Sequence, residues 1–589
     1  MRSLTRFVLL GGMALPLASF APSPGFSPAL LAALDPTRIA AALCGARQAG
    51  STLARELILA AAVAAPLDEA PPMPLYADLA GSPFPVTTES PQARRYFSQG
   101  LLLAYGFNHA GAVRSFRAAQ RLEPDCAMCW WGEAIALGPN INAAMEEADR
   151  AAALAALARA MALRAGASPL EQALIEAAAQ RYSPDAAADR AALDAAYADA
   201  MLAVAQRFPD SDDTALLAAE AAMDTTPWNY WEADKRTPIG RSGDAVRLVE
   251  AVLRRNPDHP QAAHLYIHLL EASDPQRAVA AADRLANPAA PSAGHLVHMP
   301  GHIYQRVGRH ADAIRTNIAA ARADEAFIRD TDDRSIVRYG YYPHNIHFIV
   351  TSAQMAGDMA TTLREAGRLR SVLDPATSAS IAWIQTIDAA PWLAMAQFAT
   401  ARAILAAPAP DARLPYAVAM RHYARAVAYA QQRDTRRFDA ELAALARLRA
   451  SDAFAGMIEQ GVPAPDLLSL AEAVARGRFA TAARRYDEAA AFYRQAIEIE
   501  GRLPYQEPAY WSYPVHQSLG AALFLAGRHA EASQAFRTAL TQTPNNGWAL
   551  YGLARSEAAQ GHDAEAAAAR QAFTRAWTGD RNWLRMERL

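Results

Sequence analysis

The stretch YPVHQSLGAALFLAGRHAEASQAFRTALTQTPNN, residues 513–546, carries the spacing that decides the fold. Small residues recur along it where two antiparallel helices must approach closely, and a proline ends the second helix. Counted from Tyr513 as position 1, the marker residues are Leu519 and Gly520 at positions 7 and 8, Gly527 at 15, Ala532 at 20, Phe536 at 24, Ala539 at 27 and Pro544 at 32. The stretch therefore predicts one helix pair in a unit of 34 residues.

The same frame returns after about residue 90 and again at the end of the chain. Counted from Ala93, the corresponding residues are Gly100, Ala112, Phe116, Ala119 and Pro124, with Trp130 at position 4 of the next unit. The unit from Gly547 repeats the spacing with Gly561 and Ala566. Weaker units begin near Asp212, His259, Gly294, Pro343 and Leu470. In this pattern the chain resembles the tetratricopeptide repeat proteins.

The resemblance implies an all-α fold, a tetratricopeptide-type superhelix of helix pairs, or α-solenoid. An alanine-rich sequence with few glycines is also typical of helices. We expect a signal peptide over residues 1–21 and an N-terminal extension over 22–90, followed by an array with a histidine-rich groove over 91–376. Helix pairs without a clean frame fill 377–469, and a C-terminal array fills 470–589.

Three longer phrases, residues 105–142, 295–309 and 507–523, resemble a group of exported bacterial tetratricopeptide proteins. That resemblance implies the fold and an exported location, and it supplies no function. The N-terminus agrees with export, because Arg2 and Arg6 precede an apolar run that ends in a small-x-small sequence at Ser19–Ala21. We therefore expect a periplasmic or secreted protein with no transmembrane span once the signal is removed.

Cys126 and Cys129 form the sequence CAMC. The next residue is Trp130 and not histidine, which excludes a c-type haem site. In an exported protein a local disulfide is expected, and a redox pair at a helix N-terminus is the alternative.

Seven of the fourteen histidines fall on three successive helices of the predicted array. The resemblance places positions 2, 5, 9, 12 and 13 of each first helix in the concave groove, and helical periodicity puts these positions on one face. With Gly308 at position 15, the histidines of one unit are His295, His298 and His302 at positions 2, 5 and 9. His264 and His268 lie 34 residues before His298 and His302, and His344 and His347 take positions 2 and 5 of the following unit.

Imidazoles three or four residues apart on a helix can bind one metal ion together. We expect His264, His268, His298 and His302 to converge, with His295, His344 and His347 completing one or two transition-metal centres for zinc, copper, iron or manganese. Glu220, Asp224 and Glu271 are the candidate carboxylates, as ligands or as partners that orient imidazoles. Glu271 is also the candidate general base if the centre is catalytic.

Pro300 and Gly301 fall at positions 7 and 8 of the histidine-rich helix. A proline inside a helix removes a backbone hydrogen bond, so the backbone is expected to bend between His298 and His302. Alternatively, a new helix begins at Pro300 and leaves His298 in the preceding turn. Either outcome changes where these two imidazoles point.

Two functions remain open from the sequence. One is an exported metalloprotein, a metal-dependent oxidase or hydrolase if a coordination position stays open. The other is a non-catalytic scaffold that holds a peptide, a small molecule or a partner protein in its groove. The net charge of −3 and the pI near 6.6 show no excess of basic charge of the kind that nucleic-acid binding favours. Gly-rich phosphate loops, G-x-S-x-G and H-E-x-x-H are absent from the sequence.

Overall fold

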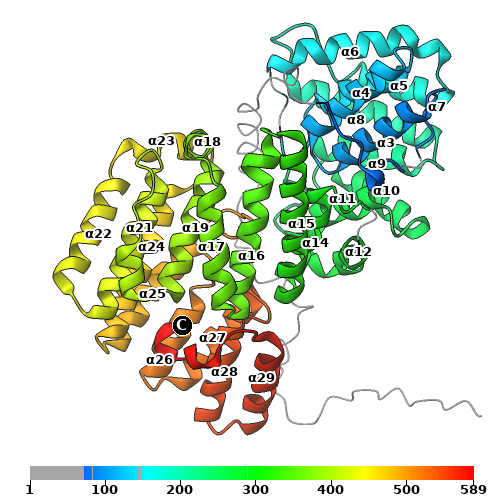
Figure 1. The fold of residues 1–589 in the computed structure, drawn as a ribbon. Coiled ribbons are helices and arrows are strands. Elements are labelled where there is room, and N and C mark those ends of the chain that lie inside the picture. Colours follow the sequence, from blue (N-terminus) through cyan, green and yellow to red (C-terminus); the bar gives the residue numbers. More distant parts are fainter. Residues whose placement is uncertain (1–71, 82–83, 144, 146, 288–289) are drawn as a thin grey trace, which may run out of the picture.

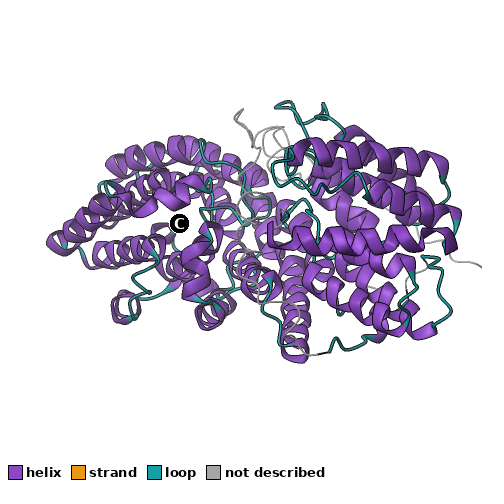
Figure 2. Cartoon of the chain, turned by 90° about the horizontal axis from the view of Figure 1, so that it is seen from above, coloured by secondary structure: helices purple, strands orange, loops and turns teal. Residues whose placement is uncertain are grey.

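The computed structural model describes residues 72–589, apart from 82–83, 144, 146 and 288–289. The predicted signal peptide (1–21) and residues 22–71 of the predicted extension lie outside the described residues. Within the described ranges the chain is helical without β-strands, and only two isolated bridges occur, Asn140 with Ala143 and Trp231 with Pro238. Figure 2 shows helices throughout, joined by loops at their ends. The predicted all-α solenoid is thereby confirmed.

The helices of the N-terminal half are α3 (Pro91–Tyr105), α4 (His109–Leu122), α5 (Ala127–Ala136), α6 (Arg150–Leu163), α7 (Pro169–Ala178), α8 (Arg190–Arg207), α9 (Asp212–Asp224), α10 (Ser242–Arg255), α11 (Pro260–Leu270), α12 (Val279–Leu285), α13 (Gly294–His298), α14 (Pro300–Arg306), α15 (His310–Thr331), the π-helix η7 (Val337–Tyr341) and α16 (Tyr342–Ala356). The later helices are α17 (Met359–Val372), α18 (Pro375–Ser380), α19 (Ala382–Phe398), α20 (Ala401–Ala406), α21 (Pro415–Gln432), α22 (Thr435–Arg449), α23 (Ala455–Glu459), α24 (Ala464–Ala482), α25 (Tyr486–Glu500), α26 (His516–Leu525), α27 (His529–Gln542), α28 (Gly547–Ala559), α29 (Asp563–Ala576), η9 (Arg581–Trp583) and η10 (Met586–Arg588).

A phenylalanine on the second helix of a repeat explains why glycines recur at fixed positions in the neighbouring helices. A Cβ atom added at Gly100 or Gly132 would lie 2.8 or 2.4 Å from the ring of Phe116. The same arrangement surrounds Phe536, where added Cβ atoms at Gly520 and Gly552 would lie 2.9 and 2.2 Å from the ring. The glycines thus leave the space into which the phenylalanine of the second helix inserts.

Local side-chain caps fix where many helices begin. Ser168 accepts from the backbone N–H of Glu171, whose carboxylate accepts from the Ser168 N–H, so the two residues form a capping box at α7. Asn108 caps α4 by accepting from the N–H of Gly111. Such caps satisfy N–H groups that have no partner inside the helix.

Buried apolar side chains form two large cores, one drawn from residues 73–341 and the other from 355–589. In Figure 1 the helices α3–α12 gather on one side, α15–α17 run through the middle, and α18–α25 lie on the other side. The last helices return to the middle of the chain, since the Trp548 indole donates to the Gln354 carbonyl and the Thr578 N–H donates to the Ala356 carbonyl. The superhelix is therefore closed by contacts between residues about 200 positions apart.

Cys126 and Cys129 are joined in a disulfide at the start of α5, as the spacing predicts, and both are buried. Among the described helices, none combines the length and apolar character needed to cross a bilayer.

Candidate metal centre

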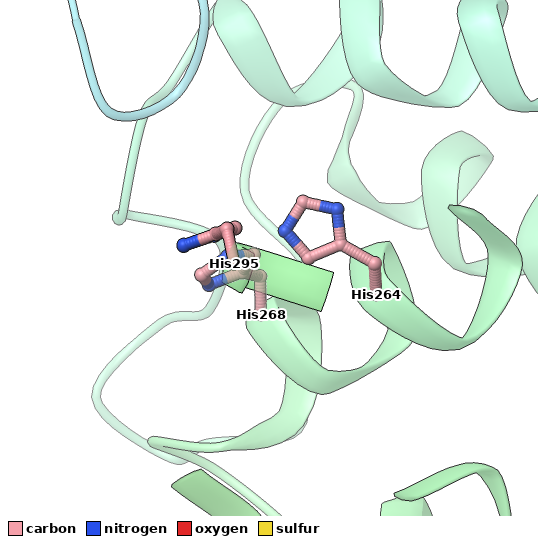
Figure 3. A group of neighbouring side chains, drawn as sticks. All are labelled: His264, His268 and His295. Carbon is pink, nitrogen blue, oxygen red and sulfur yellow. The ribbon is translucent and has the colours of Figure 1, made fainter. Parts of the chain in front are cut away.

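Six histidines from four helices form two adjacent groups. The first triad is His264 and His268 of α11 with His295 of α13, and the second triad is His298 of α13, His302 of α14 and His344 of α16. Within each triad, one nitrogen from each ring lies within 4.8 Å of the others. Figure 3 shows the first triad, with the His268 and His295 rings side by side and His264 beside them. Three imidazoles at this separation can close around one ion with a small contraction.

The two triads touch each other. The rings of His295 and His298 are 5.8 Å apart, and those of His268 and His302 are 6.0 Å apart. Glu271 links the triads, because its Oε1 lies 2.9 Å from His268 Nδ1 and its Oε2 lies 2.6 Å from His302 Nδ1. The four imidazoles expected to converge thus divide between two neighbouring triads joined by one carboxylate.

Hydrogen bonds at Nδ1 orient four of the six rings. His264 Nδ1 lies 3.0 Å from Oε1 of Gln261, and the amide nitrogen of Gln261 donates to Glu220. His268 Nδ1 lies 2.9 Å from the Glu271 carboxylate. In the second triad, His298 Nδ1 lies 2.6 Å from Asn317 Oδ1, and His302 Nδ1 contacts Glu271 and Glu507. Because each partner atom is an acceptor, each Nδ1 carries the proton. The Nε2 atoms are left to act as ligands.

The Nε2 atoms are buried without protein partners or placed against one another. Within the described chain, His264 Nε2, His268 Nε2 and both nitrogens of His295 are buried and have no hydrogen-bond partner. In the second triad, His298 Nε2 lies 2.7 Å from His302 Nε2. Two lone pairs at that distance repel unless a cation, either a proton or a metal ion, lies between them.

The bend between His298 and His302 is present. Helix α13 ends at His298 and α14 begins at Pro300, with Met299 between them in a helical conformation. Pro300 has no N–H to continue the hydrogen-bond pattern. The glycine after this proline leaves room for Asn317, because a Cβ at Gly301 would lie only 2.3 Å from Asn317 Nδ2. Gly301 therefore lets the side chain that orients His298 approach the helix.

Aromatic rings enclose both triads. The centre of the Phe107 ring lies 4.6 Å from that of His264 and 5.4 Å from that of His295. The centre of the Phe348 ring lies 4.8 Å from those of His298 and His302. Phe107 has a positive φ of 53°. Bulky residues adopt that conformation at a cost of about 1–3 kcal/mol, and such residues cluster at functional sites. These rings exclude water and strengthen the electrostatic interactions of the imidazoles.

Burial together with neighbouring imidazoles lowers the pKa of five histidines well below the usual range: His264, His268, His295, His298 and His344. Neutral imidazole is the form that binds metal ions. Burial also lowers the pKa of His302, but the carboxylates of Glu271 and Glu507 outweigh it and raise this pKa to about 10. Without a metal ion, His302 therefore carries a second proton on Nε2 and donates it to His298 Nε2, and a metal ion must displace this proton before His302 can act as a ligand.

Three predicted residues lie outside the triads. His347 is buried on α16, and burial lowers its pKa to about 3. Glu220 accepts from the amide of Gln261, the side chain that orients His264. Asp224 forms a buried ion pair of 3.1 Å with Arg181. A ligand role for these three residues stays a prediction, and Glu220 already lies where it orients the first triad indirectly.

Glu507 is the functional candidate that the repeat spacing did not supply. It comes from the loop between α25 and α26, and its carboxylate contacts His302 Nδ1 across 205 residues of sequence. Tyr505 donates to the same carboxylate, and Arg306 lies 3.8 Å from it. The only sequence signal was the unusual length and aromatic content of residues 502–514 at a junction between helices.

Residues 523–579 match the tetratricopeptide repeat family. This segment carries tetratricopeptide repeats. A comparison with the curated proteins finds no match.

Several solved structures align over most of the chain, with low similarity. The P58(IPK) TPR domain is 12% identical, with 80% of this chain and 98% of that one covered, at a TM-score of 0.20. Yeast Tom70 is 11% identical, with 82% and 94% covered, at a TM-score of 0.24. Naa15/Naa10 bound to HypK-THB is 12% identical, with 82% and 74% covered, at a TM-score of 0.20. Likeness at this level carries no inference about function.

Proposed function

We propose that this protein is a metalloprotein whose tetratricopeptide superhelix holds transition-metal ions in the two histidine triads. The observation that carries the proposal is the set of four imidazoles tied at Nδ1 to fixed acceptors. That arrangement leaves Nε2 of each ring to bind a metal ion, as in metal sites where an outer carboxylate or amide orients the ligand. Each triad adds the convergence of three ring nitrogens within 4.8 Å of one another, which the surface histidine His562 lacks although its Nδ1 also contacts a glutamate.

Imidazole donors suit zinc, copper, iron and manganese, so the donor set selects a transition metal without selecting one of them. Each triad supplies three ligands and leaves a further coordination position for water or substrate. An ion with an open position can activate water or dioxygen, which supports a hydrolase or an oxidase. Glu271 is enclosed between two Nδ1 atoms, so its first role in this proposal is to orient His268 and His302.

The test is the metal content of the full-length chain after purification and dialysis, measured by inductively coupled plasma mass spectrometry. Reloading with Co²⁺ then reports the ligand set through the visible absorption spectrum. We expect H268N/H295N to lose the ion of the first triad and H298N/H302N the ion of the second. H562N is the control, since His562 lies on the surface with a side chain 52% exposed.

Two outcomes reject the metal proposal. One is a wild-type chain that retains no transition metal after reloading and dialysis. The other is equal metal retention by wild type, H268N/H295N and H298N/H302N, which places the bound ion elsewhere.

The second candidate function is a non-catalytic scaffold, and the tetratricopeptide match at residues 523–579 favours it. Tetratricopeptide arrays present extended concave surfaces that bind peptides and proteins. This candidate predicts that a defined partner co-purifies with the chain. It also predicts that H298N/H302N leaves that partner's affinity unchanged in a titration of the purified components.

We further propose that the protein is exported. The Arg2–Ala21 sequence supports this proposal, as does a buried disulfide, a bond that persists in oxidising compartments. Mass spectrometry of the N-terminus of the native protein tests it, because an intact Met1 in a cytoplasmic fraction argues against export.

A further inference from the structure

A cavity of about 610 Å³ lies in the C-terminal half, well separated in sequence from the histidine triads. Its walls come from the ends of α19, α21 and α24 and from the C-terminal segment that contains η9 and η10. Five of its lining residues are arginines and one is a glutamate: Arg433, Arg478, Arg484, Arg585, Arg588 and Glu587. The cavity therefore concentrates positive charge in a chain whose net charge is −3.

These arginines lack the carboxylate partners that arginines elsewhere in the molecule have. Arg528, for example, pairs with both Asp487 and Glu531. Across the described residues, none of the five cavity arginines forms a salt bridge with an aspartate or a glutamate. The carboxyl ends of α21 and α24 add only partial negative charge beside Arg433 and Arg484. The positive charge is thus left available to a ligand.

Two of the arginines are held in place by the protein. Arg478 donates to the Arg588 carbonyl at 2.9 Å and to the Tyr513 hydroxyl at 3.2 Å. The Arg588 guanidinium stacks 3.8 Å from the centre of the Trp583 ring. Burial, together with the charges of Arg585 and Arg478, lowers the pKa of Arg588, as expected for cations that lack an anion between them.

A neutral donor lines the same cavity. The side-chain nitrogen of Gln397 is buried and has no hydrogen-bond partner in the described chain, while its oxygen accepts from Gln354 at 2.7 Å. A buried donor without a partner is uncommon in proteins and points to a missing acceptor. Phosphate and carboxylate oxygens are acceptors of this kind.

We propose that this cavity binds a small molecule that carries two or more anionic groups. Its volume falls in the range of small-ligand pockets, about 300–1,000 Å³. One guanidinium group can donate two hydrogen bonds to a phosphate or a carboxylate. Five arginines provide more positive charge and more donors than one singly charged anionic group can use. The proposal is independent of metal at the histidine triads.

The experiment is calorimetric titration of the full chain with inorganic pyrophosphate, citrate and inorganic phosphate at constant ionic strength. We expect pyrophosphate or citrate to bind about tenfold or more tightly than phosphate, with affinity that falls as sodium chloride is raised. The tighter of pyrophosphate and citrate identifies phosphate or carboxylate as the preferred group. R484Q/R585Q removes two exposed cavity arginines and is expected to weaken binding about tenfold or more.

R436Q/R447Q is the matched control, because it removes the same charge from exposed positions on α22 and is expected to bind as wild type does. Thermal melting establishes that each variant is folded. The proposal is overturned if no multivalent anion binds, or if only an acidic peptide binds. It is also overturned if R484Q/R585Q binds pyrophosphate as wild type does, since the anion then binds outside this cavity.

Discussion

At the scale of single residues, the second triad depends on the close approach that Gly301 permits. We expect G301A to displace Asn317, because the added Cβ would lie 2.3 Å from its side-chain nitrogen. His298 then loses its orienting acceptor, and metal affinity at the second triad is expected to fall about tenfold or more. The overlap itself costs about 1–3 kcal/mol of unfolding free energy. Urea denaturation and Co²⁺ titration measure the two effects.

Gly367 on α17 is the matched control, since nothing lies within 4 Å of an added Cβ there. G367A is expected to leave metal affinity unchanged and to stabilise the helix by about 0.5–1 kcal/mol. Equal metal affinity in G301A and G367A would show that Asn317 does not set the position of His298.

Glu271 offers a second test at this scale. E271Q keeps the shape of the side chain but removes the charge that faces His268 and His302. We expect metal affinity to fall about tenfold to a hundredfold, since outer partners contribute that much to metal binding. A variant that keeps full metal affinity but loses a catalysed reaction would instead assign Glu271 the role of general base.

At the scale of helices, the repeat spacing predicted the packing because its causes are local. Phe116 and Phe536 each insert between two glycines that lie 16 residues before and after them. The spacing also predicted which helices carry the clustered histidines. It left open whether the histidines form one or two centres, because that depends on ring orientations set by Gln261 and Asn317.

The start of α15 carries a histidine whose burial gives a pH dependence. His310 is buried with Nε2 3.1 Å from the Pro544 carbonyl, and burial lowers its pKa to about 4. The unfolded chain therefore binds this proton more readily than the folded chain. Neutral His310 therefore contributes its full share of the unfolding free energy at a pH above its ordinary pKa of about 6.5. As the pH falls from there toward 4, the unfolding free energy decreases by about 1.4 kcal/mol per pH unit.

The measurement is the free energy of urea unfolding from pH 8 to pH 5, compared between wild type and H310Q. Other buried histidines titrate in both proteins, so the difference between the two curves isolates His310. We expect wild type to lose more stability than H310Q below about pH 6.5. Parallel curves would show that the His310 contact has no titrating role.

At the scale of the whole molecule, closure of the superhelix brings together residues that no repeat spacing relates. Glu507 reaches His302 from the C-terminal half, and the same half contacts the turn between α14 and α15 through Pro544 and Asn545. A search for residues 34 positions apart cannot find the His302–Glu507 pair. The sequence separation of these two residues depends on how many helix pairs lie between the parts of the superhelix that come into contact. The metal centre and the closure of the array are therefore structurally coupled.

Gly308 tests this coupling. Its φ is +76°, and a Cβ there would lie 2.3 Å from the Pro544 carbonyl oxygen. Gly527 is the equivalent turn glycine, with a φ of +78° and nothing within 4 Å of an added Cβ. G527A therefore measures only the left-handed strain, about 1–2 kcal/mol, while G308A adds the loss of the contact between the two halves, about 1–3 kcal/mol more.

The second expected effect of G308A is on the metal centre. Separation of the two halves moves Glu507 away from His302, so Co²⁺ affinity at the second triad is expected to fall about tenfold while G527A binds as wild type does. Small-angle X-ray scattering should report a larger radius of gyration for G308A than for G527A. If G308A opens the array in scattering but keeps wild-type Co²⁺ affinity, then Glu507 does not contribute to the site, and the metal centre is complete within helices α11–α16.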